Sequence, residues 1–264
     1  MVGKKTRLVA KGFSQVKGVN YDKTYAPVIN KVTLRFLFAI AAELDLEIFQ
    51  LDVKTAFLHG ELGPLEEIFM ISIEGMPYPV GTILKLAKSL YGLKQGSRVW
   101  YLTLKQFILD YGFTQSIIDK GLFFIDNELG RIYAAIYVDD ILLFGKDIAY
   151  ITLFKQALGN RFNIEDLGVA KLFLGMEIER DRARKTIKLS QRRYLTSVIA
   201  TYGAADNVSS YKVPIIKDTL NHIVTSDSGA AKLFEERIPY RNLLGAQLYA
   251  NICTRPELTN AISV

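Results

Sequence analysis

The segment that most constrains the fold is AAIYVDDILLF, residues 134–144, in which two adjacent carboxylates interrupt an apolar run. Burying unpaired carboxylates costs several kcal/mol, so Asp139 and Asp140 must lie where water or a cation reaches them. Two apolar strands joined by a tight turn at the aspartates meet this requirement. The turn alone allows two interpretations, a solvated β-turn that favours Asp or one part of a metal site.

A third carboxylate occurs in a second strand pattern, EIFQLDV at residues 47–53. Alternation places Phe49, Leu51 and Val53 on one face and Gln50 and Asp52 on the other. If this strand neighbours the hairpin, its carboxylate converges with those of the turn. Such a cluster repels itself unless cations occupy it, and hard oxygen ligands suit Mg²⁺. Two ions held by shared carboxylates are typical of nucleotidyl transfer.

The remaining patterns mix helices and antiparallel strands, so the predicted fold class is α+β. Helices are expected at 32–46 with Thr33 as the cap, at 98–112 ending at Gly112, at 148–158 and, after Ser190, at 194–202 and in the C-terminal part. Strands are expected at 68–73, in a hairpin of 121–126 with 131–138, and in a last pair of 171–180 with 186–190.

Composition excludes several classes of protein. The only cysteine, Cys253, permits no internal disulfide, and with His59 and His222 as the only histidines a zinc site is not expected. No apolar run is long enough for a membrane span, so an intracellular protein is expected, without a membrane partner. A net charge of +6, gathered in basic clusters, permits a polyanion partner, although each cluster alone is more typical of a solvated face.

Many ordered segments resemble the reverse transcriptase domain of copia-class LTR retrotransposon Pol polyproteins. In chain order they are RLVAKGFSQ, YAPV, QLDVKTAFLHGEL, SLYGLKQ, YVDDILLFG, DLG, FLGMEIERD, LSQRRY and YRNLLGAQLYANICTRPEL. The resemblance covers essentially the whole chain. It implies a right-hand polymerase fold of fingers, palm and thumb, with an antiparallel palm sheet and a YxDD hairpin. Residues 1–180 would form truncated fingers interleaved with the palm, and residues 181–264 the mainly helical thumb and the start of a connection.

The resemblance also implies RNA-directed DNA polymerase activity, adding dNTPs to a primer 3′-hydroxyl on an RNA or DNA template. The catalytic metal ligands would be Asp52, Asp139 and Asp140, holding two Mg²⁺ ions, with Mn²⁺ as a possible substitute. The other implied site residues are Arg7 and Lys5 or Lys4 on the phosphates, Phe57 as an aromatic gate under the sugar, Gln95, Gly96 and Tyr137 near the dNTP or primer end, and Leu174, Gly175 and Met176 as the primer grip. Taken singly, these residues are equally typical of surface cations, core packing or glycine turns.

The sequence departs from the family pattern in ways that keep a second interpretation open. The family normally carries a further fingers segment upstream, and Glu165 stands where the family often has a lysine, for which Lys171 is a weak substitute. Ribonuclease H and integrase would be partners in the intact element, which would work in a cytoplasmic virus-like particle. The alternative is an inactive remnant that at most binds template–primer. A palm polymerase that makes RNA is disfavoured by Phe57.

Overall fold

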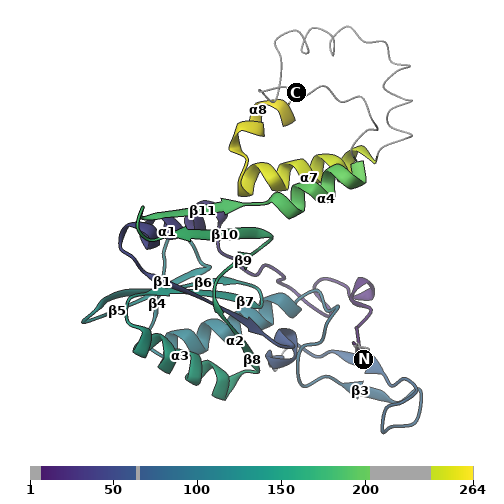
Figure 1. The fold of residues 1–264 in the computed structure, drawn as a ribbon. Coiled ribbons are helices and arrows are strands. Elements are labelled where there is room, and N and C mark those ends of the chain that lie inside the picture. Colours follow the sequence, from purple (N-terminus) through teal and green to yellow (C-terminus); the bar gives the residue numbers. More distant parts are fainter. Residues whose placement is uncertain (1–6, 64–65, 203–238, 264) are drawn as a thin grey trace, which may run out of the picture. The chain divides into compact units, whose positions relative to one another are not determined.

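The computed structural model describes residues 7–63, 66–202 and 239–263 (Figure 1). The chain divides into two compact units, Met1–Ala170 and Lys171–Val264. Of the helices in the described ranges, none is both long and apolar enough to cross a lipid bilayer. The assignment of residues 1–180 to fingers and palm and of 181–264 to the thumb stays a prediction.

A six-stranded antiparallel sheet forms the centre of the first unit, with the strand order β4-β5-β6-β7-β1-β8. Its strands are β1 (Glu47–Val53), β4 (Thr114–Gln115), β5 (Leu122–Asn127), β6 (Gly130–Tyr137), β7 (Asp140–Gly145) and β8 (Ile164–Val169). The predicted strand at 47–53 and the predicted hairpin are both present, and β1 pairs with the second hairpin strand. With helices on this sheet, the α+β prediction is confirmed.

Helices cover the two faces of this sheet unequally. On one face, Leu51 and Val53 of β1 are buried under α2 (Gly96–Asp110) and α3 (Ile148–Arg161). The opposite face meets α1 (Lys31–Glu43), where the rings of Phe38 and Phe144 lie 5.6 Å apart. In Figure 1, α2 and α3 lie below the sheet and α1 above it. The period of two in β1 therefore separates its apolar core face from the face that carries Gln50 and Asp52.

The observed helix ends correct the sequence prediction in detail. The cap of α1 is Asn30 rather than Thr33, because the Asn30 side chain accepts a hydrogen bond of 2.8 Å from the Val32 amide. The helix ends at Glu43, and Asp45 follows with φ of 52°, so Leu44 lies beyond the last turn and is half exposed. Gly112, with φ of 110°, follows the end of α2 as predicted.

The turn of the β6–β7 hairpin differs from the prediction that both aspartates form it. Tyr137 pairs with Asp140, so the two-residue connection consists of Val138 and Asp139. Asp140 is the first residue of β7 and is half-buried rather than exposed in the turn. Val138 adopts φ of 59°, and its carbonyl accepts a 2.7 Å hydrogen bond from the Trp100 indole. Shifting the turn by one residue moves Asp140 onto the face of the sheet that it shares with Asp52.

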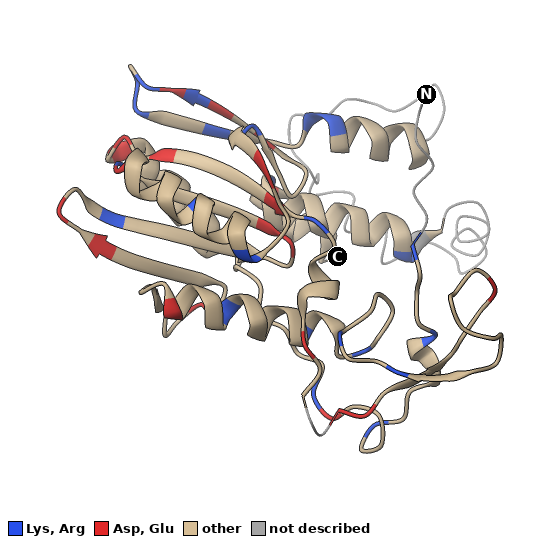
Figure 2. Cartoon of the chain, turned by 90° about the horizontal axis from the view of Figure 1, so that it is seen from below, with Lys and Arg blue, Asp and Glu red and all other residues tan. Residues whose placement is uncertain are grey.

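The remaining elements of the first unit are small. A two-stranded sheet joins β2 (Phe69–Ile71) and β3 (Ile83–Lys85), and two 3₁₀ turns occur at Gly12–Ser14 and Ala56–His59. The strand predicted at 68–73 is therefore present but shorter. Figure 2 shows basic (blue) and acidic (red) segments interspersed along the strands and turns of this unit.

The second unit combines a three-stranded sheet with helices. The strands β9 (Leu172–Phe173), β10 (Met176–Asp181) and β11 (Thr186–Ser190) are followed by α4 (Arg192–Tyr202), α7 (Tyr240–Cys253), a 3₁₀ turn at Pro256–Leu258 and α8 (Thr259–Ile262). Helices α4 and α7 contact through the rings of Tyr194 and Tyr249, whose centroids lie 5.1 Å apart. The predicted pairing with 186–190 and the helix at 194–202 are present, but the strand predicted at 171–180 is divided by a turn at Leu174 and Gly175 into β9 and β10, which pair with each other.

Candidate active site

The register of three neighbouring strands places three carboxylates in a row. Asp52 of β1 pairs with Asp140 of β7 on one side and with Glu165 of β8 on the other. Directly paired residues of antiparallel strands lie on the same face of the sheet, so all three carboxylates share one face. Because the side chains of a strand alternate, this is the face opposite the core residues Leu51 and Val53.

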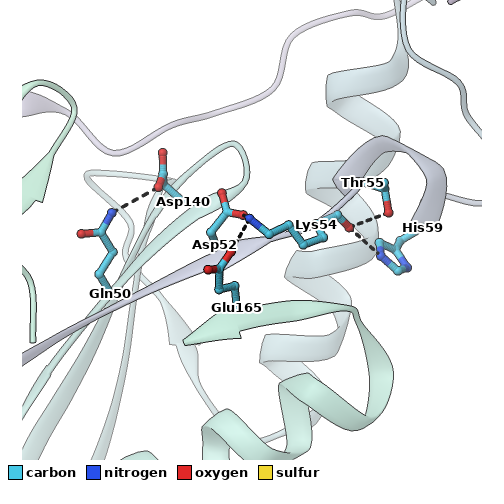
Figure 3. Close-up of polar contacts among 7 residues, drawn as sticks. All are labelled: Gln50, Asp52, Lys54, Thr55, His59, Asp140 and Glu165. Carbon is cyan, nitrogen blue, oxygen red and sulfur yellow. Dashed lines mark hydrogen bonds and ion pairs between the residues drawn. The ribbon is translucent and has the colours of Figure 1, made fainter. Parts of the chain in front are cut away.

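Asp140 is the half-buried carboxylate of the row at its β7 end. Its carboxylate accepts a long hydrogen bond of 3.4 Å from the amide of Gln50, which is itself buried (Figure 3). Burial, together with the nearby charges of Asp139 and Asp52, raises the pKa of Asp140, and the Gln50 hydrogen bond opposes this effect. The charged form of Asp140 is therefore destabilised in the folded chain, as expected of a carboxylate among like charges.

Lys54 bridges the other two carboxylates of the row. Its ammonium lies 2.6 Å from Asp52 Oδ2 and 2.5 Å from Glu165 Oε2 (Figure 3). These two carboxylates raise the pKa of Lys54, so the side chain carries its positive charge. One cation thus already offsets part of the negative charge that the strand register gathers here.

A cavity of about 410 Å³ opens beside this row. Asp52 and Asp139 line it together with Arg7, Lys54 and Tyr91. Its wall therefore combines carboxylates with cationic side chains, which is the composition needed to hold a phosphate group next to a metal-binding carboxylate pair. Two of the three predicted catalytic aspartates and the predicted phosphate ligand Arg7 thus meet in one cavity.

Phe57 lies in the 3₁₀ turn that follows β1. Its ring packs edge-on against Tyr91, with the centroids 5.0 Å apart, and it also packs against the core. The guanidinium of Arg7 lies over the other ring of this pair, 5.8 Å from the centroid of Tyr91. Tyr91 therefore joins the predicted gate to the predicted phosphate ligand.

The other predicted substrate residues have different surroundings. The Gln95 side chain is fully buried, donates to the Asn20 carbonyl at 3.0 Å and accepts from the Gln15 amide at 3.0 Å, so its amide is used within the protein. Gly96 begins α2, where an added Cβ would lie 3.2 Å from Ser89 Oγ. Lys5 and Lys4 lie outside the described residues.

Tyr137 pairs with Asp140 at the end of the β6–β7 hairpin. The predicted primer grip belongs to the second unit, where Leu174 and Gly175 form the turn between β9 and β10 with φ of 48° and 70°. Tyr249 donates its hydroxyl to the Leu174 carbonyl, and Met176 is buried. This turn is therefore held in place by α7 of the same unit.

The chemistry of the row fits a divalent cation, because carboxylate oxygens are the ligands that Mg²⁺ prefers. Asp52 and Asp140 face each other across β1 and β7, and such an ion would offset the burial and the neighbouring negative charges that raise the pKa of Asp140. Among residues 7–63, 66–202 and 239–263, however, no three His, Cys, Asp or Glu side chains close on a common point. Asp52 is instead engaged by Lys54.

Two residues around this site, Lys54 and Tyr91, were not predicted, whereas Gln50 was placed on the Asp52 face without a role. Lys54 lies two positions after Asp52, so the alternation of β1, continued by one residue, could have placed it on the same face. Tyr91 gave no such signal, because it lies in the loop before α2 and not in a strand with a regular period. The loop reaches the cavity, and the Ala10 amide donates a 2.7 Å hydrogen bond to the Tyr91 carbonyl.

Comparisons with known proteins agree with the motifs. The sequence profile of the family described as "Reverse transcriptase (RNA-dependent DNA polymerase)" matches residues 1–217. The "Retrovirus-related Pol polyprotein from transposon TNT 1-94" of Nicotiana tabacum is 38% identical over 272 residues, which cover 100% of this chain and 20% of that protein. The corresponding polyproteins from transposons RE2 and RE1 of Arabidopsis thaliana are each 34% identical over 98% of this chain and 17% of their own length.

The chain spans about a fifth of the length of these relatives. The "Putative transposon Ty5-1 protein YCL074W" of Saccharomyces cerevisiae is 26% identical over 81% of the chain and 67% of that protein. The expected resemblance to copia-class retrotransposon Pol polyproteins is confirmed, and the chain belongs to the reverse transcriptase family of RNA-dependent DNA polymerases.

Proposed function

We propose that this chain is the polymerase part of a retrotransposon Pol polyprotein and adds dNTPs to a primer 3′-hydroxyl on an RNA or DNA template. One observation carries the proposal: in a member of the reverse transcriptase family, Asp52 and Asp139 line the same cavity as the cationic side chains of Arg7 and Lys54. Carboxylates beside cations are what binding of a metal–triphosphate requires.

Asp52, Asp139 and Asp140 would hold two Mg²⁺ ions, for which Mn²⁺ could substitute. When bound, such ions lower the pKa of the attacking hydroxyl and offset charge on the phosphates. Gln50 contacts the Asp140 carboxylate through its 3.4 Å hydrogen bond. The Val53 amide donates a 2.8 Å hydrogen bond to the Asp139 carbonyl, which fixes the hairpin turn against β1.

The cationic and aromatic residues of the cavity would bind and select the nucleotide. A guanidinium suits bidentate contact with phosphate, and Arg7 is held over the Tyr91 ring at the cavity wall. Phe57, fixed edge-on against Tyr91, would leave no room for a 2′-hydroxyl and so would favour dNTPs. The glycine at position 96 permits close approach of the backbone near the dNTP and template, and Tyr137 lies at the hairpin end.

The fold assignment that belongs to this proposal is a right hand, with the six-stranded sheet as the palm and α4 as part of the thumb. The turn at Leu174, Gly175 and Met176 would grip the primer. Contacts to a nucleic-acid backbone would be independent of sequence and weakened by salt. Ribonuclease H and integrase would be supplied by other parts of the polyprotein.

Primer extension on an RNA template with dNTPs and Mg²⁺ tests the proposal. The Asp139→Asn variant should lose extension, whereas Asp110→Asn, which removes an exposed carboxylate on α2, should retain it. Equal extension by the parent chain and Asp139→Asn would refute the catalytic assignment. No extension by the parent chain would favour a remnant that only binds template–primer.

A further inference from the structure

The backbone around Lys54 fixes where its side chain starts. The Lys54 amide donates a 2.7 Å hydrogen bond to the Asn163 carbonyl next to β8. Its carbonyl accepts from Thr55 Oγ1 at 2.7 Å and lies 3.1 Å from His59 Nε2. Both backbone polar groups are therefore satisfied, and the side chain leaves β1 on the face of Asp52, between β1 and β8 (Figure 3).

The same ammonium contacts two carboxylates that differ in their surroundings. Asp52 lies in the centre of the row, next to Asp140, and its side chain is 26% exposed, whereas that of Glu165 is 52% exposed. Asp52 is a predicted metal ligand, and Glu165 has no part in the predicted metal set. A metal cation that binds Asp52 would thus compete with the Lys54 ammonium, which already contacts that carboxylate.

We propose that Lys54 is a positioning residue that holds Asp52 until a divalent cation binds, and that Glu165 retains the ammonium when the cation displaces it from Asp52. This inference rests on the proposed function, since it requires a divalent cation at Asp52. Glu165 already lies 2.5 Å from the ammonium, so the exchange breaks one contact and keeps the other. A lysine side chain allows this because it is a point charge on a flexible stem.

The exchange predicts two changes in divalent-cation affinity, and the second of them distinguishes it from a simple charge effect. Without Lys54, the incoming cation displaces nothing, so divalent-cation affinity should increase. Without Glu165, the displaced ammonium has lost its second partner, so affinity should decrease. The second effect depends on Lys54, whereas a long-range charge effect of Glu165 would not.

The test measures Mn²⁺ binding to the full chain by calorimetry, without nucleic acid or nucleotide. Lys54→Met should tighten the Kd by about two- to fivefold, the range expected for a solvent-accessible ion pair. Glu165→Gln should weaken the Kd by a similar factor in the parent chain but by a clearly smaller factor when combined with Lys54→Met. Lys85→Met and Glu67→Gln are the matched controls and should leave the Kd unchanged, because they disrupt an ion pair of the same 2.5 Å length between β3 and the residues before β2.

Far-UV circular dichroism of each variant establishes that it is folded before binding is measured. Equal weakening by Glu165→Gln with and without Lys54→Met would overturn the inference, as would an unchanged Kd in Lys54→Met. Both results would leave the proposed polymerase function intact. Binding by the parent chain no tighter than by an Asp52→Asn variant would refute the metal assignment in the proposed function, and the inference with it.

Discussion

The indole of Trp100 connects α2 to the turn of the candidate catalytic hairpin, and replacing it should destabilise the first unit. Its Nε1–H donates a 2.7 Å hydrogen bond to the carbonyl of Val138, the turn residue with φ of 59°. The side chain is 1% exposed, and its ring lies edge-on to Phe162 with the centroids 5.2 Å apart. Trp100→Phe therefore removes a buried donor and leaves a smaller ring in the core.

Two contributions set the magnitude. Losing the indole leaves the part-buried Val138 carbonyl without this hydrogen bond, which costs about 1–3 kcal/mol. A small core deletion adds about 1 kcal/mol for lost packing. We therefore expect Trp100→Phe to reduce the free energy of unfolding by about 2–4 kcal/mol, a large part of the ~5–15 kcal/mol typical of a domain.

Urea denaturation provides the assay. Trp100 is the only tryptophan of the chain, so its fluorescence identifies the unfolding transition of the first unit in the parent, and far-UV circular dichroism then follows the same transition in the variant. Phe162→Leu is the matched control, because it removes the aromatic neighbour but keeps the indole hydrogen bond; it should cost about 1 kcal/mol. A loss below about 1 kcal/mol for Trp100→Phe would refute the view that the indole holds the hairpin turn.

Three further substitutions test the site. Burial and like charges raise the pKa of Asp140 in the folded chain above its unfolded-state value. The stability contributed by protonated Asp140 is therefore fully present below the unfolded-state pKa and is lost as pH rises through the folded-state pKa. Asp140→Asn should accordingly raise the Tm at neutral pH and have less effect in acid, and an equal shift in both would contradict this assignment. Phe57→Ala should admit rNTPs in primer extension, whereas unchanged sugar discrimination would show that Phe57 is not the gate. Thr55 has φ of 53°, a conformation that asparagine tolerates better than a β-branched residue, so Thr55→Asn should stabilise the chain by up to about 1 kcal/mol in urea denaturation; a destabilisation would mean that the hydroxyl bond to the Lys54 carbonyl outweighs the backbone strain.

The sequence predicted the strands around the site well because their signal is local. A period of two over 47–53 identified both the core face of β1 and the face of Asp52, and the apolar runs around Asp139 identified a hairpin. The turn position was wrong by one residue, because the pairing of Tyr137 with Asp140 and the left-handed backbone of Val138 depend on tertiary contacts such as the Trp100 hydrogen bond. Val138 is β-branched, and propensity alone disfavours a positive φ there.

Long-range partners were beyond the reach of sequence reasoning. Gln95 was predicted near the substrate from its motif, but its side chain is buried against Gln15 and Asn20, residues about 80 positions away in the sequence. Glu165 was recognised as a departure from the family pattern, yet its contact with Lys54 required the pairing of β8 with β1. Register between strands far apart in sequence is set by the packed sheet, and no periodicity within one strand reveals it.

The position of the carboxylate row along its strands explains how one face of the sheet holds both charges and a packed helix. Asp140 begins β7 and Asp52 is one residue from the end of β1, so the row lies at one end of the sheet, beside the cavity. The next pair on the same face, two residues along each strand, joins Gln50 to the buried Leu142, and the one after it joins Ile48 to Phe144, which contacts Phe38 of α1. The face therefore changes from charged through amide to apolar within three same-face pairs, and the amide of Gln50 forms the boundary by donating a hydrogen bond to the Asp140 carboxylate. Helix α1 can then pack on the apolar end of this face without removing water from Asp52 and Asp140 at the other end. The same face of the sheet can therefore contribute to the packed fold and hold the carboxylates of the site.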